Sequence, residues 1–216
     1  MMIIYIHGFN SGFHPGGYKI ASLQKIATVT GVSYDSFSMH DEVFRVLGDQ
    51  LGDLLDPFQP LHGQTGLPKV ALAGTSLGGY WAARFGREFG IPAVLINPTI
   101  HPHRSLQRYV GHKLLNFVTR DRNILRKEVP ASYGDIEREG DFLILLDKGD
   151  EVLHYREAEQ WFAGGTAAST TAPAADHKCK IATFEGGSHR FDHMDESHPE
   201  ILEFLKHQPL SPCSKP

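Results

Sequence analysis

The chain has 216 residues, enough for one domain with a sizeable core, and its 41% hydrophobic and 21% charged residues are ordinary for a globular protein. Its formal net charge of −4 argues against a nucleic-acid-binding protein or a basic membrane-surface protein. We find no apolar run near the roughly 18 residues that span a bilayer and no secretory signal, so we expect no membrane span and a cytoplasmic location. Cys179 and Cys213 are expected to be free thiols, in keeping with a reducing compartment.

Short apolar runs alternate along the chain with longer amphipathic segments. We predict strands at residues 3–6, 32–37, 70–73, 93–96, 142–146 and 180–184. We predict helices from about residue 17 to 29 and at residues 41–55, 76–89, 154–162 and 197–205. This alternation predicts an α/β fold, with a mostly parallel central sheet of about six strands and helices on both faces, in three layers (αβα). The carboxyl ends of parallel strands share one edge of the sheet, so a ligand site is expected there.

A single domain is predicted over residues 1–207, with two interruptions and a tail. Residues 99–140 are polar, with a possible helix at 105–117, and predict either a small lid-like excursion or a long surface crossover. Residues 164–176 lack large apolar side chains and predict a flexible loop, because they cannot bury enough surface to offset the entropy of ordering. Residues 208–216 are predicted to be a Pro/Ser-rich C-terminal tail.

The segment around Ser76 is the most informative part of the chain. An apolar run over residues 70–73 leads into Gly74-Thr-Ser-Leu-Gly78, and a segment with helical character follows at once. This is the G-x-S-x-G pattern in a strand–turn–helix context, typical of the nucleophile elbow of α/β-hydrolases. Glycines at both ends allow the strand and helix to approach closely. The alternative is a glycine-rich turn in which Ser76 only caps the helix.

A second motif, His7-Gly8-Phe9, directly follows the first predicted strand. A carbonyl attacked by a serine develops negative charge on its oxygen, and backbone N–H groups that bind this oxygen form an oxyanion hole. In an α/β-hydrolase one such group belongs to the residue after the nucleophile, here Leu77, and the other to an early loop, here Phe9. We expect His7 to brace this loop rather than to transfer protons.

Acidic residues crowd the turn after the strand predicted at 142–146. A serine hydrolase needs a carboxylate that orients its histidine and stabilises the imidazolium. Asp150 is our choice, because it follows Gly149 a few residues beyond the strand, and Asp147 is the alternative. All of these acids could instead be solvated turn residues.

His189 follows the last predicted strand, after two consecutive glycines that permit a tight loop. We predict it to be the general base and acid, with His193 and His198 as nearby alternatives. The resulting order, Ser76, then Asp150, then His189, is the serine–acid–histidine chain order of α/β-hydrolases.

Five segments resemble the small bacterial esterases of the YqiA/YcfP type. They are Ile4-Tyr-Ile-His-Gly-Phe-Asn-Ser11, Gly74-Thr-Ser-Leu-Gly-Gly-Tyr-Trp-Ala82, Ile96-Asn-Pro98, Gly149-Asp-Glu-Val-Leu153 and Glu185-Gly-Gly-Ser-His189. The resemblance extends from about residue 2 to 206. It implies a compact α/β-hydrolase fold with little or no cap and carboxylester hydrolase activity, and it supports Ser76 as nucleophile, Asp150 as acid and His189 as base.

We therefore expect a serine esterase that acts on small or short-chain acyl esters or thioesters and needs no cofactor. Hydrolysis of amide, peptide or lactone bonds on the same fold is one alternative, and a non-catalytic binding scaffold is another. No metal site is expected. We interpret His101-Pro-His103 as loop histidines, and the acids and histidines between Asp192 and His198 as a polar surface turn.

Overall fold

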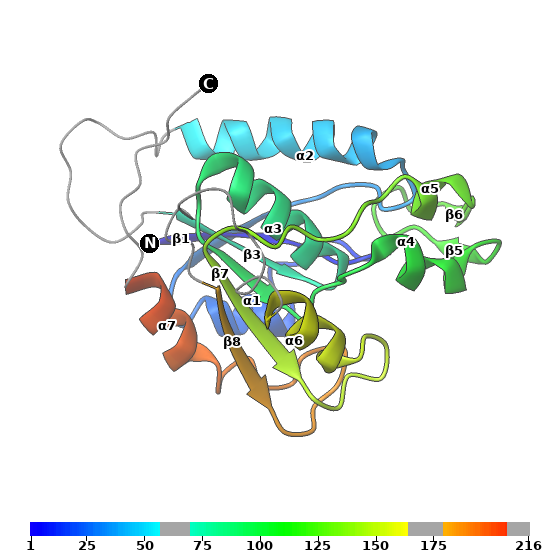
Figure 1. The fold of residues 1–216 in the computed structure, drawn as a ribbon. Coiled ribbons are helices and arrows are strands. Elements are labelled where there is room, and N and C mark those ends of the chain that lie inside the picture. The colour runs from blue at the N-terminus through cyan, green and yellow to red at the C-terminus, as the bar shows by residue number, and fades with distance from the viewer. Residues whose placement is uncertain (57–69, 164–178, 207–216) are drawn as a thin grey trace, which may run out of the picture.

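The computed structural model describes residues 1–56, 70–163 and 179–206. Its centre is a parallel sheet of six strands in the order β2-β1-β3-β4-β7-β8 (Figure 1). The strands are β1 (Met2–Ile6), β2 (Thr28–Val32), β3 (Val70–Thr75), β4 (Ala93–Ile96), β7 (Phe142–Asp147) and β8 (Cys179–Phe184). The parallel α/β architecture expected from the sequence is confirmed.

Helices cover both faces of this sheet, which gives the three expected layers (Figure 1). The longer helices are α1 (Tyr18–Leu23), α2 (His40–Leu55), α3 (Leu77–Phe89), α6 (Tyr155–Ala163) and α7 (His198–Lys206). Side chains of α2, α3 and α6 pack on one face, and those of α1 and α7 pack on the other. Among the described residues, no helix combines the length and apolarity needed to cross a membrane.

The strands show why this sequence makes a buried sheet. All residues of β3, β4 and β7 are buried, because both faces of these strands are covered by helices. Alternate side chains of β1 enter opposite cores: Ile4 and Ile6 join the core with α2 and α3, whereas Ile3 and Tyr5 join the core with α1 and α7. Continuous apolar runs are therefore what these central strands require.

The structure corrects two predicted elements near the N-terminus. The helix that was predicted from about residue 17 to 29 ends at Leu23, and the strand predicted at 32–37 is instead Thr28–Val32. The β-branched residues of this segment form an edge strand in register with β1. Beyond it, the Asp35 carboxylate accepts the N–H of Phe37 at 2.9 Å, a side-chain turn that stops extended pairing.

The helix predicted at 105–117 is also wrong. Residues 99–140 contain α4 (Pro102–Ser105), the 3₁₀ helix η2 (Leu106–Tyr109), the hairpin of β5 (Lys113–Leu115) with β6 (Arg122–Ile124), and α5 (Glu128–Ala131). The Asn116 side chain accepts the N–H groups of Val118 and Thr119, so a turn replaces the last helical residues expected there. The predicted loop at 164–176, the tail at 208–216 and Cys213 lie outside the described residues.

Candidate active site

The turn between β3 and α3 holds Ser76 in a strained backbone conformation. Its φ of 55° and ψ of −121° lie in a region that residues with side chains rarely adopt, and such strain costs about 1–3 kcal/mol. A Cβ at Gly74 would collide with the carbonyl group of Gly78, and a Cβ at Gly78 would collide with the carbonyl oxygen of Ile6. The turn therefore needs glycine at both positions, and it leaves Ser76 half-buried at the carboxyl end of β3.

The loop after β1 passes directly beside this serine. A Cβ on Gly8 would lie 3.3 Å from the Cβ of Ser76. His7 braces the loop from its buried side: its Nδ1–H donates to the Gly8 carbonyl at 2.9 Å, and its Nε2 accepts the N–H of Tyr34 at 3.3 Å. Burial lowers the pKa of His7, so the ring stays neutral and serves both contacts.

Two backbone N–H groups close to Ser76 have no hydrogen-bond acceptor within the part of the chain that the structure describes. They belong to Phe9, which follows Gly8 in the loop, and to Leu77, the first residue of α3. The N-terminus of a helix carries a partial positive charge. These N–H groups are therefore available to an anionic oxygen.

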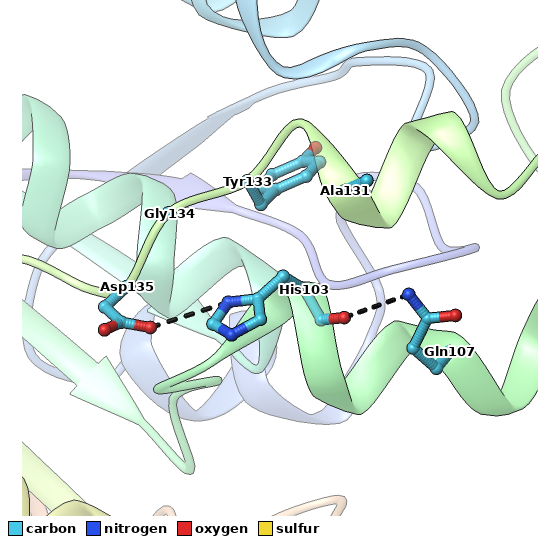
Figure 2. A pocket seen from close by; sticks show the side chains of 6 residues that line it. All are labelled: His103, Gln107, Ala131, Tyr133, Gly134 and Asp135. Atoms are coloured by element: carbon cyan, nitrogen blue, oxygen red, sulfur yellow. Dashed lines mark hydrogen bonds and ion pairs between the residues drawn. The ribbon is translucent and has the colours of Figure 1, made fainter.

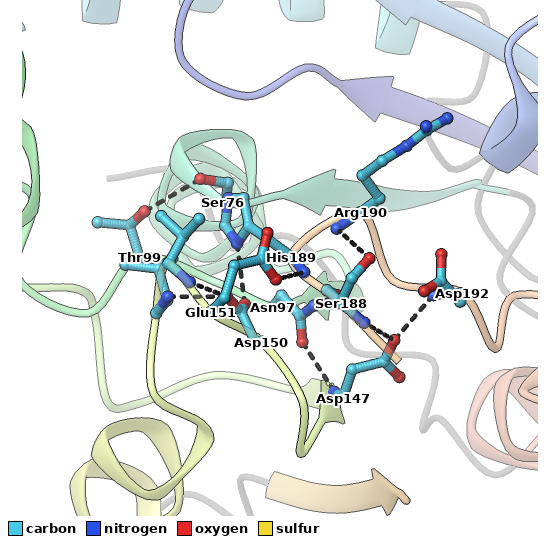
Figure 3. Close-up of polar contacts among 12 residues, drawn as sticks. Ser76, Asn97, Thr99, Asp147, Asp150, Glu151, Ser188, His189, Arg190 and Asp192 are labelled. Carbon is cyan, nitrogen blue, oxygen red and sulfur yellow. Dashed lines mark hydrogen bonds and ion pairs between the residues drawn. The ribbon is translucent and has the colours of Figure 1, made fainter. Parts of the chain in front are cut away.

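Asp150 follows β7, His189 follows β8, and their side chains are hydrogen-bonded (Figure 3). His189 Nδ1 lies 2.8 Å from Asp150 Oδ2. The Asp150 side chain is 1% exposed, and its Oδ1 accepts the N–H groups of Val152 and Leu153 at 2.8 Å each. A carboxylate held in this way keeps the proton of neutral His189 on Nδ1 and leaves Nε2 free to accept one.

Glu151 holds the backbone of the same histidine. Its Oε2 accepts the N–H of His189 at 3.0 Å. Hydrogen bonds from the N–H of Glu151 itself and from that of His189 lower the pKa of this carboxyl. The contact is therefore made by a carboxylate at neutral pH.

Consecutive residues at the end of β4 link the serine to the histidine loop. The N–H of Ser76 donates to the carbonyl of Ile96 at 3.0 Å, and Asn97 Nδ2 donates to the carbonyl of Ser188 at 3.0 Å. Ser188 directly precedes His189, so one short network brings Ser76 and the histidine loop to the same edge of the sheet (Figure 3).

The hydroxyl of Ser76 has a different partner. Its Oγ lies 3.4 Å from Thr99 Oγ1 and, among the described residues, makes no hydrogen bond to His189. Catalytic hydrogen bonds of this kind are often long without substrate and shorten when it binds. The serine is therefore positioned by its backbone rather than by a bond to the imidazole.

A second aspartate–histidine pair lies beside the first. Asp147, the alternative acid of the sequence analysis, is fully buried, and its Oδ1 lies 2.7 Å from His193 Nδ1. Its Oδ2 accepts the N–H groups of Ser188 and Asp192 at 3.1 and 2.8 Å. The hydrogen bond that His193 donates to the Asp147 carboxylate raises the pKa of His193. Asp147 thus clamps the loop that carries His189, while His189 itself pairs with Asp150.

Sequence reasoning gave no role to two residues of this network, Asn97 and Thr99. Asn97 directly follows β4, and its side chain also accepts the N–H of Asp147 at 2.9 Å. Its position after a strand is the same signal that selected the other candidates, so the sequence could have indicated it. Thr99 carries no such signal, because only the folded turn brings it to Ser76.

Acids and histidines between Asp192 and His198 have partners other than a metal ion among the described residues. His193 pairs with Asp147, and Asp195 binds Lys25 Nζ and the Ser22 hydroxyl at 2.6 Å each. Within the described ranges, the group of three side chains close enough to share an ion is a different one: His101, His103 and Asp135.

Comparison with solved structures shows the α/β-hydrolase fold. The esterase of Pyrobaculum calidifontis superposes with a TM-score of 0.62 at 17% identity, over 95% of this chain and 75% of that one. A monoacylglycerol lipase from Paleococcus ferrophilus superposes with a TM-score of 0.60 at 17% identity, over 94% and 93%.

Sequence relatives are found in bacteria. A UPF0227 protein of Vibrio parahaemolyticus is 29% identical over 215 residues, which cover 94% of this chain and 98% of the relative. A UPF0227 protein of Vibrio cholerae is 30% identical over 172 residues, which cover 74% of this chain and 81% of the relative. Residues 2–206 match the profile of the uncharacterised protein family UPF0227, the family of the YqiA/YcfP type. The chain therefore belongs to the UPF0227 family.

Proposed function

We propose that this protein is a serine carboxylesterase that hydrolyses small or short-chain acyl esters or thioesters. The observation that carries the proposal is the strained Ser76 at the β3–α3 turn, at the same sheet edge as a histidine held by a buried aspartate. The esterase and lipase among its structural neighbours agree with a hydrolase. The mechanism needs no cofactor.

In the proposed reaction Ser76 Oγ attacks the acyl carbonyl while His189 Nε2 takes the serine proton. Asp150 holds the imidazole through Nδ1 and stabilises the imidazolium that forms. The N–H groups of Phe9 and Leu77 bind the oxygen as its negative charge grows, and each such donor contributes about 2.7–4 kcal/mol. The alcohol or thiol then leaves with a proton from His189.

The second half of the reaction reuses the same groups. Water activated by His189 attacks the acyl group on Ser76, and collapse of the tetrahedral intermediate releases the acid and restores the serine. The unpartnered N–H groups of Phe9 and Leu77 support this proposal, because both are free to donate to an oxygen bound beside Ser76. The cytoplasm remains the expected compartment.

Aromatic side chains around Phe9 support a lid-like role for residues 99–140. The Phe9 ring stacks on Tyr109 at 5.0 Å and contacts Phe37 at 5.4 Å between centroids. Tyr109 belongs to η2, so the excursion packs against the proposed oxyanion loop. We propose that this aromatic group borders the acyl chain.

The test compares wild-type protein, Ser76→Ala and the matched control Ser33→Ala, an exposed serine at the end of β2, with p-nitrophenyl acetate and butyrate. We expect Ser76→Ala to lose at least about 10⁴-fold in kcat/KM, because the nucleophile is gone, and Ser33→Ala to match the wild type. Equal hydrolysis by wild type and Ser76→Ala would overturn the proposal.

A fluorophosphonate probe separates the remaining alternatives. We expect it to label Ser76, identified by peptide mass, in the wild type and in Ser33→Ala but not in Ser76→Ala. A scaffold without catalytic function would not be labelled. A panel of peptide, amide and lactone substrates then tests whether esters are the preferred class.

A further inference from the structure

Three side chains that commonly bind metal ions meet at the start of α4. His101 precedes α4, His103 lies in its first turn, and Asp135 follows α5; Figure 2 shows the last two facing each other. One ligand atom from each residue lies within 4.8 Å of the ligand atoms of the other two. Asp135 Oδ1 is 2.6 Å from His101 Nδ1 and 3.5 Å from His103 Nδ1. Ligand atoms around a tetrahedral zinc ion, with bonds of about 2.0–2.1 Å, lie about 3.3 Å apart.

The second ring nitrogen of His101, Nε2, lies near a carboxylate. Its Nε2 lies 4.0 Å from Glu157 Oε1 on α6, and its side chain is 13% exposed. The ring meets Trp161 edge-on at 5.0 Å between centroids. A ligating histidine usually directs its second N–H at a carboxylate, which orients the ring. In the structure Nδ1 is hydrogen-bonded to Asp135, and an ion bound there would take the place of that hydrogen bond.

The two segments that carry these residues are joined by their backbones. The N–H of Ile136 donates to the carbonyl of Ile100 at 2.9 Å, beside Asp135 and His101 respectively. Pro102 begins α4 and restricts the backbone between the two histidines. The ligands are therefore held near one another before any ion binds.

His103 supplies an independent observation. Its Nδ1 is hidden from solvent, and within the described part of the chain it has no hydrogen-bond partner, since Asp135 at 3.5 Å makes only a loose ion-pair contact. Hidden polar atoms in folded proteins nearly always have a partner. A bound cation would give this nitrogen a partner, and it would replace the hydrogen bond that joins His101 Nδ1 to Asp135 Oδ1.

We propose that His101, His103 and Asp135 bind one divalent transition-metal ion, with Zn²⁺ as the expected occupant. Two imidazoles and one carboxylate suit Zn²⁺, Co²⁺ or Ni²⁺, whereas Mg²⁺ and Ca²⁺ prefer oxygen ligands alone. Three protein ligands leave a coordination position for water or a small ligand, and an open cavity of about 440 Å³ adjoins His103 and Asp135 (Figure 2).

The ion would fasten the segment after α5 to the start of α4. His101 lies two residues beyond Thr99, the hydrogen-bond partner of Ser76. The metal therefore belongs to the base of the 99–140 excursion, and its expected role is to stabilise that segment. This inference does not depend on the esterase proposal.

The test uses full-length protein without a polyhistidine tag, treated with a chelator and then dialysed. We expect calorimetric titration with Zn²⁺ to show one site per wild-type chain, and Co²⁺ to give the visible absorption of a tetrahedral ion. His103→Gln and Asp135→Asn are expected to weaken Zn²⁺ binding at least tenfold. Glu157→Gln is expected to weaken it less. The matched control His112→Ala, at an exposed histidine of the same excursion, should bind as the wild type does.

Thermal unfolding gives a second readout, after circular dichroism has shown that each variant is folded. We expect saturating Zn²⁺ to raise the Tm of the wild type and of His112→Ala but not that of His103→Gln. Absence of saturable one-to-one binding by the wild type would overturn the proposal. It would also be overturned if His103→Gln and Asp135→Asn bound Zn²⁺ as tightly as the wild type.

Discussion

Two aspartate–histidine pairs lie side by side on the same two loops, and they differ mainly in what surrounds them. The aspartates come from the end of β7 (Asp147) and from the turn after it (Asp150), and both histidines come from the loop after β8. His189 Nδ1 is 2.8 Å from Asp150, and His193 Nδ1 is 2.7 Å from Asp147. Both carboxylates are almost inaccessible, with side chains 1% and 0% exposed.

The difference lies in the remaining contacts. Asp147 also accepts two backbone N–H groups of the loop after β8, and the ring of His193 stacks on Phe184 at 5.3 Å between centroids. The Ser188 carbonyl next to His189 is instead bound by Asn97, on the turn that borders Ser76. An aspartate–histidine hydrogen bond alone therefore does not identify a proposed catalytic base. We expect one pair to serve chemistry and the other to hold the loop.

The largest expected difference is in rate. His189→Ala should lower kcat/KM for p-nitrophenyl acetate by about 10⁴-fold, because the proton acceptor of Ser76 is lost. His193→Ala should lower it by no more than about tenfold, because it only loosens the loop. Equal losses in the two variants, or a larger loss in His193→Ala, would break the proposed division of roles.

The second pair should matter more for stability than for rate, and Asp147 is the residue that tests this. Asp147→Asn should lower the free energy of unfolding by about 2–4 kcal/mol, because it weakens charge-assisted bonds and turns an amide N–H₂ toward backbone donors. Urea denaturation measures this effect. The matched control Asp49→Asn, at an exposed pair with Arg45, should cost less than about 0.5 kcal/mol. If Asp147→Asn were as stable as the control variant, Asp147 would not be holding the loop after β8 in place.

Two adjacent glycines in the loop after β8 offer a further test of how firmly the Asp147 carboxylate is held. Gly187 has a φ of 72°, and a Cβ there would collide with the Asp147 carboxylate, whereas Gly186 has a φ of 70° with open space around it. Alanine at either position costs about 1–2 kcal/mol for the left-handed backbone. Gly187→Ala should be destabilised further by the collision, measured as a lower urea midpoint than that of Gly186→Ala. Equal midpoints would mean that the carboxylate can move aside.

The smallest expected effect is a pH dependence. The bond to Asp147 raises the pKa of His193 in the folded protein, so the protonated pair stabilises the fold fully below the unfolded value of about 6.5. This contribution is lost as pH rises through the folded pKa of His193. The stability advantage of wild type over His193→Gln, measured by urea denaturation from pH 5 to 9, should therefore shrink with rising pH. A stability advantage that stays constant or grows with pH would contradict a stabilising interaction between protonated His193 and Asp147.

Much of the fold was predictable because its strands are buried on both faces. Continuous apolar runs at β3, β4 and β7 can be satisfied only inside a covered sheet, and the glycine spacing around Ser76 permits one kind of turn. The edge strand β2 was misplaced because its residues are only partly buried, so its apolar pattern is weak. Pairing with β1, a contact distant in sequence, decides where it begins.

The amino-acid sequence was enough to select the candidate site residues, since each follows a strand and carries chemistry suited to an acyl transfer. It left open which aspartate faces which histidine, because Asp147 and Asp150 are only three residues apart, at the end of β7 and in the turn after it. The pairing becomes visible in the folded chain, through hydrogen bonds between the β7 and β8 loops, because these contacts join residues about 40 positions apart. The same holds for the meeting of Asp135 with His101 and His103, where more than 30 residues of chain are closed into one contact that no local pattern encodes.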